Sequence, residues 1–325
     1  MKPKFIVQAD AGPLIGAGHI MRCLPLIEAL TELKYEVEVL GTIINLPWVI
    51  DALTNTGVKI HNSSDKLDIS ISTNDVLILD SYTLPVESPL ILNKKWSKII
   101  VIGDLYTPNY LCDLFINMSM SQLARSSKSR ARNFLSGPEY IMTRNEIIKA
   151  KSSANLQQVL KQKILVSGGA SDFENFTHEV VKKLMMIDFN FEVCVFSKQP
   201  PNFFYDSRFT FKSLGSDLVK EIEGVNLFIS TAGTSAFDFL TLGGVLALGC
   251  AVENQIENYV QLQVNGLAIG VGECDKNGVW NLDSEKLNSF LADKELQDKL
   301  IARSKNLFKG EGAMKITNEI LNLVL

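Results

Sequence analysis

The sequence predicts an α/β protein made of two Rossmann-like, doubly wound domains. Short apolar runs of strand length alternate with amphipathic stretches of helix length, a pattern typical of parallel sheets covered by helices. Glycine-rich turns follow an early apolar run and a second one near the middle of the chain. The chain has 325 residues, which exceeds the usual size of one hydrophobic core.

The composition is that of a globular protein, with 46% hydrophobic and 21% charged residues. A formal net charge of −4 and the lack of a long basic run argue against nucleic acid as a partner. The sequence shows no apolar stretch of membrane-spanning length and no secretory signal pattern at its start. Five scattered cysteines without a CxxC pair indicate neither a disulfide framework nor a zinc site, so we expect a cytoplasmic location.

The first domain is expected to cover residues 1–145. Its expected strands are 5–9, 36–40, 58–61, 75–79, 98–102 and 114–117, with helices at 20–33 and 48–53. The run VLIL before Asp80 is typical of a strand that is buried on both faces of a parallel sheet. The polar and basic segment 119–133 is expected to be a mobile surface loop.

The second domain is expected to cover residues 146–325. Its expected strands are 163–167, 191–196, 209–212, 227–230, 245–248 and 267–271, with helices at 177–186, 236–242 and 258–265 and a helical tail from residue 284. Whether the last helix stays in this domain or returns to the first is left open. Glycine turns at strand ends in both domains suggest that the domains face each other across a ligand cleft.

The stretch DAGPLIGAGHIMR, residues 10–22, joins the first strand to the first helix. Gly16 and Gly18 would let the backbone adopt positive φ and approach a ligand closely. The free N–H groups at the start of the helix favour an anion there and disfavour a protonated His19. A neutral imidazole at this place suggests a general base acting on a phosphorylated substrate. The alternative is a purely structural turn, because the pattern is neither GxGxxG nor a Walker motif.

Polar side chains follow three expected strands of the first domain: Asp10, Asp80 with Tyr82, and Asp104. Doubly wound sheets bind ligands beyond the carboxyl ends of their strands, so these residues are candidates for substrate binding. Each aspartate could instead cap a helix or hold a turn, which is its commoner use at such places.

In the second domain, Gly233, Thr234 and Ser235 lie at an expected helix start. Backbone N–H groups and hydroxyls there would suit a diphosphate, although a simple N-cap is the alternative. Asn254 and Gln255 offer amides for ribose or sugar hydroxyls, with capping again the alternative. A further glycine turn, Gly168–Gly169, follows the first strand of this domain.

Together these stretches resemble a known family. The motifs are DAGPLIGAGHIMRCLPL, LILDSY, LYTPNYLCDLFIN, GPEYIMTR, ILVSGGASDFENFT, FISTAGTSAFDFLTLGG, VENQIEN and GLAIGVG, in order over about the first 270 residues. They are similar to the PseG type of nucleotide-sugar hydrolase, the UDP-2,4-diacetamido-2,4,6-trideoxy-β-L-altropyranose hydrolases of pseudaminic acid biosynthesis. That family has the glycosyltransferase B fold and is related to the MurG glycosyltransferases.

The resemblance implies hydrolysis of a UDP-sugar at its anomeric carbon, with inversion, release of UDP, and no metal or cofactor. It implies that His19 is the base, that Tyr82 lines the sugar site and that Asn254 approaches the substrate. It also implies that Thr234 and Ser235 face the diphosphate. The other substrate-binding residues that we expect are Asp10, Gly16, Gly18, Arg22, Asp80, Asp104, Gly168, Gly169, Gly233, Asp238, Glu253 and Gln255.

Three positions depart from the family pattern. Gln8 stands where arginine is usual, Gly103 replaces the first residue of an Asp-Asp-Leu motif, and Asp238 stands where glutamate is usual. These departures put the identity of the sugar in doubt. The sequence also leaves the oligomeric state open. The alternative function is a glycosyltransferase of the same fold, which would need an acceptor besides the nucleotide sugar. A non-catalytic protein that binds nucleotide sugars is a further alternative.

Overall fold

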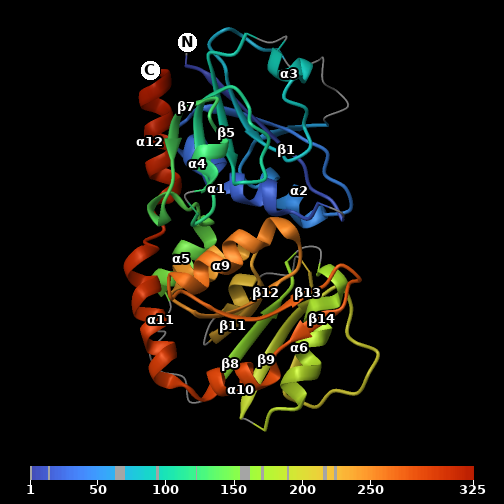
Figure 1. The fold of residues 1–325 in the computed structure, drawn as a ribbon. Helices are drawn as coiled ribbons and strands as arrows, with labels where there is room; N and C mark the ends of the chain where they lie inside the picture. The colour runs from blue at the N-terminus through green and yellow to red at the C-terminus, as the bar shows by residue number, and fades with distance from the viewer. Residues whose placement is uncertain are drawn as a thin grey trace. The chain divides into compact units, whose positions relative to one another are not determined.

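The structure is a computed structural model (Figure 1). It describes residues 2–13, 15–62, 70–92, 95–121, 123–153, 162–169, 172–188, 190–214, 218–222 and 225–325. The chain forms two compact units: residues 1–144 together with 310–325, and residues 145–309. Within the described ranges, no helix is long and apolar enough to cross a membrane.

Unit 1 is built on a parallel sheet of seven strands. The strands are β1 (Lys4–Ala9), β2 (Glu36–Leu40), β3 (Lys59–His61), β4 (Val76–Asp80), β5 (Lys98–Gly103), β6 (Cys112–Asn117) and β7 (Ala131–Leu135). The helices are α1 (Gly18–Glu32), α2 (Pro47–Thr54), α3 (Pro89–Leu92), α4 (Leu123–Ser127), η2 (Pro138–Tyr140) and α12 (Gly312–Val324).

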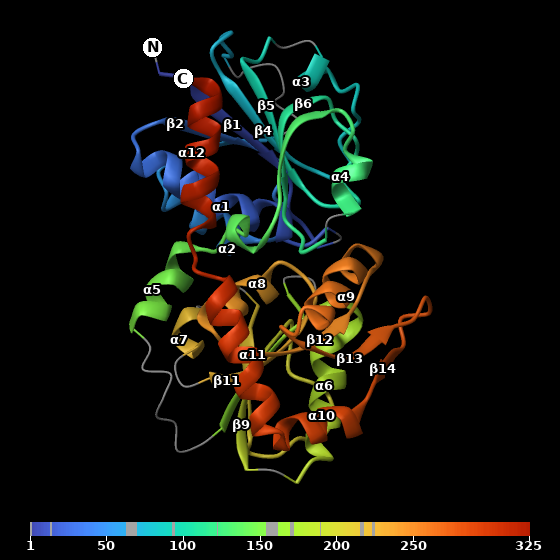
Figure 2. The same cartoon turned by 60° about the vertical axis from the view of Figure 1, so that its left-hand side comes forward.

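The strand order in unit 1 is β3-β2-β1-β4-β5-β6-β7. The order reverses direction between β1 and β4, which therefore flank the topological switch point where doubly wound sheets bind ligands. Every side chain of β4 is buried, and this explains its continuous apolar run. Helices α1 and α12 pack against each other beside the sheet (Figures 1 and 2).

Unit 2 has the same plan, with one antiparallel strand at its edge. The strands are β8 (Gln162–Ser167), β9 (Phe191–Ser197), β10 (Phe209–Ser213), β11 (Val225–Thr231), β12 (Val245–Cys250), β13 (Ile269–Cys274) and β14 (Trp280–Leu282). The helices are α5 (Asn145–Ser153), η3 (Phe173–Asn175), α6 (Phe176–Met185), α7 (Leu218–Ile222), α8 (Ser235–Leu242), η4 (Glu253–Gln255), α9 (Ile256–Val264), α10 (Ser284–Ala292) and α11 (Lys294–Leu307).

The strand order in unit 2 is β10-β9-β8-β11-β12-β13-β14, so β8 and β11 flank its switch point. Only the β13–β14 pair is antiparallel among the described pairings. Helix α6 packs against β8, β9 and β14, and α8 packs against β11 and β12, with α11 beside it (Figure 2). The predicted fold class, two Rossmann-like domains with doubly wound sheets, is confirmed.

One expectation about the segment 119–133 is wrong. Instead of a mobile loop, it contains helix α4 and the first residues of strand β7. Lys128, between these two elements, is only 5% exposed. The segment has no apolar run because β7 is an edge strand whose side chains are only partly buried.

Candidate active site in unit 1 and anion site in unit 2

A buried polar network lies at the switch point of unit 1. Asp80, the last residue of β4, is completely buried and accepts hydrogen bonds from side chains of the neighbouring helix α1. The strand order places the end of β4 directly beside β1, with Asp80 paired with Ala9 in register. Helix α1, which follows β1 through the glycine turn, thus brings His19 and Arg22 to Asp80.

Asp80 bonds to both partners at short range. His19 Nδ1 lies 2.6 Å from Asp80 Oδ1, and Arg22 donates from Nη2 to the same oxygen at 2.6 Å and from Nε to Oδ2 at 2.5 Å. The arginine contact is bidentate, the strongest geometry for a guanidinium and a carboxylate. Burial alone would raise the pKa of Asp80, but Arg22 and His19 outweigh it and hold that pKa below its usual value.

A second carboxylate, Asp104, lies one residue beyond β5 and extends the network. Arg22 Nη1 lies 3.5 Å from Asp104 Oδ2, and the Tyr82 hydroxyl donates a short hydrogen bond to the same oxygen. Burial raises the pKa of Tyr82, and the nearby Asp104 charge raises it further, so the phenol stays protonated as a donor. Five predicted site residues are therefore brought together here: His19, Arg22, Asp80, Tyr82 and Asp104.

The ring of His19 is held on two sides. Its Nδ1 faces Asp80, and the Tyr82 ring packs edge-on against it with ring centroids 4.4 Å apart. When Nδ1 carries the proton that it donates to a carboxylate, Nε2 has the free lone pair. The arrangement therefore gives a buried imidazole of fixed orientation that can accept a proton at Nε2, with a carboxylate to stabilise the resulting imidazolium.

The turn after β5 explains the departure at Gly103. Thr107 Oγ1 accepts a hydrogen bond from the Asp104 N–H at 3.0 Å and sits where a side chain at residue 103 would begin. A Cβ added to Gly103 would lie 2.1 Å from that oxygen. The Asp104 carboxylate is oriented in turn by the Tyr106 N–H at 3.0 Å from Oδ1. The glycine is thus required by space, because the Thr107 side chain fills the position.

The predicted residues of the first glycine turn have a different role. Asp10 Oδ1 accepts the Thr42 N–H at 2.7 Å, which ties the end of β1 to the loop after β2, and no contact with the Asp80 network is described. Gly16 has a φ of 73°, as expected for a close turn. The expectation of positive φ at Gly18 is wrong, because Gly18 is the first residue of α1.

In unit 2, helix α8 begins at Ser235, directly beyond the carboxyl end of β11. Thr234 occupies the N-cap position, but its side chain makes no capping hydrogen bond. Among the described residues, the backbone N–H groups of Thr234 and Ser235 also have no acceptor. The helix start therefore presents free donors at the switch point of this sheet, as an anion site requires.

Several polar atoms near this helix start are buried without a partner among the described residues. They are Ser230 Oγ, Asn254 Oδ1, Glu257 Oε1 and Asn258 Oδ1. Asn258 Nδ2 lies 3.5 Å from the Ala232 carbonyl, and this places α9 beside the β11–α8 turn. Gln255 is already engaged, since its Oε1 accepts the Ala251 N–H at 3.0 Å. Ser230, Glu257 and Asn258 did not stand out in the sequence, because only the fold brings them to this turn.

The remaining predicted residues of unit 2 lie in a loop after β8, in helix α8 and in η4. Gly169, with a φ of 73°, and Gly168 follow β8, the strand next to β11, and Asp172 Oδ1 occupies the space above Gly168. Asp172 holds this loop to α6 through the Thr177 N–H and hydroxyl. Asp238 is buried within α8, and Glu253 is an exposed residue of η4.

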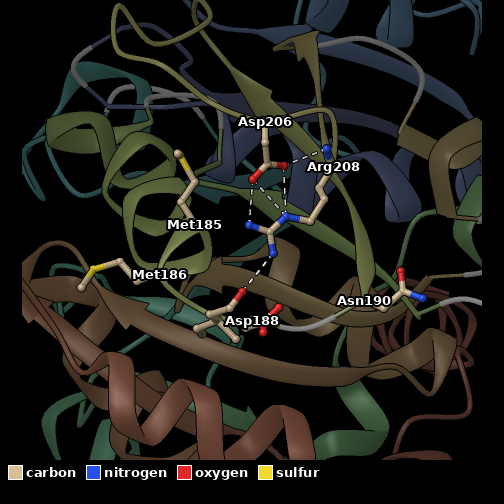
Figure 3. A pocket seen from close by; sticks show the side chains of 7 residues that line it. Met185, Met186, Asp188, Asn190, Asp206 and Arg208 are labelled. Carbon is tan, nitrogen blue, oxygen red and sulfur yellow. Dashed lines mark hydrogen bonds and ion pairs between the residues drawn. The ribbon is translucent and has the colours of Figure 1, made fainter.

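A separate hollow of about 380 Å³ lies on unit 2 and is lined by Met185, Met186, Ile187, Asp188, Asn190, Asp206 and Arg208 (Figure 3). It lies beside the amino ends of β9 and β10, whereas α8 begins beyond the carboxyl end of β11. Its one arginine, Arg208, donates to Asp206 at 2.8 Å (Figure 3). Arg208 also donates to the Ile187 carbonyl at 2.9 Å. These contacts make Arg208 a structural residue.

The sequence itself matches no family model and no curated protein. Solved structures are similar over the whole chain. The glycotransferase of kitacinnamycin is 13% identical, with a TM-score of 0.67 over 99% of each chain. MurG of Acinetobacter baumannii is 14% identical, with a TM-score of 0.58 over 98% of this chain and 100% of its own. The spinosyn rhamnosyltransferase SpnG, complexed with thymidine diphosphate, is 13% identical, with a TM-score of 0.61 over 99% of each chain. These likenesses show that the chain has the fold of the glycosyltransferase B type.

Proposed function

We propose that this chain is an enzyme that breaks the bond between the anomeric carbon of a sugar and a nucleoside diphosphate. The observation that carries the proposal is the contact of His19 Nδ1 with the buried Asp80 at the switch point of unit 1. This pair supplies an oriented base, and unit 2 supplies a helix start suited to a diphosphate. A solved structure of the same fold was obtained with thymidine diphosphate, and this supports a nucleotide ligand.

The proposed step is a single displacement at the anomeric carbon. An oxygen nucleophile gives its proton to His19 Nε2 and forms a bond to C1, while the bond from C1 to the diphosphate oxygen breaks with inversion. The electron pair leaves on the diphosphate, and hydrogen-bond donors are needed there to stabilise the developing charge. Arg22, held by Asp80, and the Tyr82 hydroxyl, held by Asp104, would contact sugar oxygens in unit 1.

Two nucleophiles suit this chemistry. If the nucleophile is the hydroxyl of an acceptor, the protein is a glycosyltransferase. We favour this function because the similar solved structures are named as glycosyltransferases. Water would make it a hydrolase of a UDP-2,4-diacetamido-2,4,6-trideoxyhexose, an enzyme of pseudaminic acid biosynthesis. The resemblance of the GAGHIMRC and VENQIEN motifs to that family supports this second candidate.

The test is incubation of the protein with a UDP-2,4-diacetamido-2,4,6-trideoxyhexose in EDTA without any acceptor, with the products followed by NMR. Prompt release of free sugar and UDP would establish the hydrolase. Binding of the nucleotide sugar with no release would favour the transferase, and a screen of hydroxyl acceptors would then follow. Failure to bind any nucleoside-diphosphate sugar would contradict the proposal in both forms.

A further inference from the structure

Lys128 lies in the polar segment that follows α4, and its placement is unusual for a lysine. The residue is only 5% exposed. Its ammonium donates hydrogen bonds to the backbone carbonyl of Leu105, at 2.8 Å, and to that of Thr107. The Phe115 ring lies 5.9 Å from Nζ. Among the described residues, no carboxylate lies within ion-pair distance, so the cation is held mainly by main-chain oxygens.

Burying the Lys128 ammonium is unfavourable by itself, so its placement indicates a specific role for this residue. Burial lowers the pKa of Lys128, and the nearby Asp104 charge partly offsets this shift. A lysine whose only task was to fill space would be expected to carry its ammonium to solvent along its flexible stem. Here the stem ends inside the protein, on the loop that joins β5 to β6.

The two carbonyls belong to the turn that orients Asp104. This turn is closed by the Asp104 N–H on Thr107 Oγ1 at 3.0 Å and by the Thr107 N–H on the Asp104 carbonyl at 3.3 Å. Lys128 bridges the carbonyls of residues 105 and 107 from outside, so it ties the turn to α4. A shift of this turn would move the Asp104 carboxylate, which binds the Tyr82 hydroxyl and faces Arg22.

We propose that Lys128 is a positioning residue, which fixes Asp104 and, through Asp104, the hydroxyl of Tyr82 for recognition of the sugar. The inference rests on the proposed function only for the identity of the ligand. The coupling of Lys128 to Tyr82 can be tested without any substrate. Lys128 touches no reacting atom in this account, so it acts on binding of the sugar and leaves the base His19 in place.

The first measurement needs no ligand. The protein is labelled with ¹³C at the tyrosine Cζ atoms, and the Tyr82 signal is assigned from its loss in Tyr82→Phe. Lys128→Met keeps the stem but removes the donors, and we expect it to shift the Tyr82 signal, while Lys128→Arg restores the position of the signal. The matched control is Lys151→Met in unit 2, because Lys151 is also a partly buried lysine that donates to a backbone carbonyl, that of Phe308 at 3.0 Å.

A Tyr82 signal that stays unchanged in a folded Lys128→Met protein would overturn the inference. So would an equal shift in Lys151→Met, because the effect would then be a general result of losing a buried cation. A Lys128→Met protein that does not fold leaves Lys128→Arg and Lys128→Gln to decide. Coupling then requires the glutamine variant to shift the signal more than the arginine variant does.

The second measurement uses the nucleotide sugar. For Lys128→Met we expect KM for the UDP-sugar to rise about tenfold, the effect of losing one well-placed hydrogen bond, with a smaller change in kcat. The affinity for UDP alone should not change, because UDP lacks the transferred sugar that Tyr82 is proposed to recognise. A loss in kcat with an unchanged KM would contradict the positioning role. A wild-type protein inactive on every nucleotide sugar would refute the proposed function, while the tyrosine signal would still decide the coupling.

Discussion

At the scale of single residues, Asp80 is the centre of the candidate site. One fully buried carboxylate accepts hydrogen bonds from His19 and from two nitrogens of Arg22, and the Cys23 thiol lies 3.6 Å from it. Burial and the Asp80 charge raise the pKa of Cys23, so this thiol stays protonated and is an inert neighbour. A buried carboxylate of this kind is stable only with its partners in place, and this makes its loss measurable.

We predict that Asp80→Asn destabilises unit 1 in a pH-dependent way. The pKa of Asp80 is lowered in the folded protein, so its contribution is complete above the ordinary aspartate pKa of about 4 and is lost as the pH falls through the lowered value. Removing the charge takes the bidentate partner from the buried Arg22 and leaves it only the longer contact with Asp104 at 3.5 Å, which costs about 3 kcal/mol at pH 7.

Urea unfolding of both proteins at pH 7 and at pH 3 checks this. The difference in the free energy of unfolding should be large at pH 7 and smaller at pH 3, where the unfolded wild-type chain binds a proton at Asp80 and part of the stabilisation is lost. Asp298→Asn is the control, because Asp298 pairs with Lys294 on an exposed helix face and should have little effect at either pH. A difference that does not vary with pH would show that Asp80 is not a buried ion-pair partner.

At the scale of elements, the turn after β5 couples a glycine to a threonine. Gly103→Ala would place a methyl group 2.1 Å from Thr107 Oγ1, and we expect a destabilisation of about 1–3 kcal/mol from this overpacking. Thr107→Ala removes Oγ1 and Cγ2 but keeps Cβ, which would lie 2.7 Å from the new methyl group, so it relieves the overlap only in part; it also loses the bond to the Asp104 N–H. The double variant should therefore be more stable than the sum of the single effects predicts, and thermal or urea unfolding of all four proteins measures this coupling. If the effects of the two substitutions on the free energy of unfolding simply add, residues 103 and 107 are not in contact as described.

The elements differ in how well the sequence predicts them. Buried parallel strands such as β4 and β12 are continuous apolar runs, so their positions follow from composition. The edge strands β7 and β14 do not stand out, because β7 is only partly buried and β14 has three residues. The short helices α3, α4 and α7, of four or five residues, are too brief for a helical period to appear.

At the scale of the whole molecule, the end of the chain completes unit 1. Helix α12 packs on α1, and its first residue, Gly312, lies so close to the Ile141 backbone that a Cβ would fall 2.1 Å from the Ile141 carbonyl oxygen. A backbone atom cannot move aside as a side chain can. Gly312→Ala should therefore lift the start of α12 away from η2 and weaken unit 1.

Hydrogen exchange followed by mass spectrometry checks this expectation. Peptides from β1 and α1 should exchange faster in Gly312→Ala, while peptides from β8 and α8 in unit 2 should not change. Met314→Ala is the matched control, because Met314 is 45% exposed on the same helix. Faster exchange in both units would show that α12 does not belong to unit 1 alone.

The candidate site was predictable residue by residue, but its assembly was not. Asp80, Tyr82 and Asp104 stand out because each follows an apolar run. Their contact with His19 depends on the strand order, which puts β4 beside β1 although 61 positions separate His19 from Asp80. No local sequence pattern indicates the order of the strands in the sheet. For the same reason Lys128 and Glu257 gave no signal, since only the folded chain shows what surrounds them.

The central claim is that His19, oriented by Asp80, is the base for cleavage of a nucleotide sugar. The most direct test is to compare wild-type protein with His19→Leu, following UDP release from a UDP-2,4-diacetamido-2,4,6-trideoxyhexose by NMR, with any acceptor that the wild-type protein requires. We predict that the rate falls by about 10²–10⁴-fold, the usual contribution of a positioned base, while calorimetry shows UDP binding as in the wild type. A His19→Leu protein that releases UDP at the wild-type rate would contradict the account.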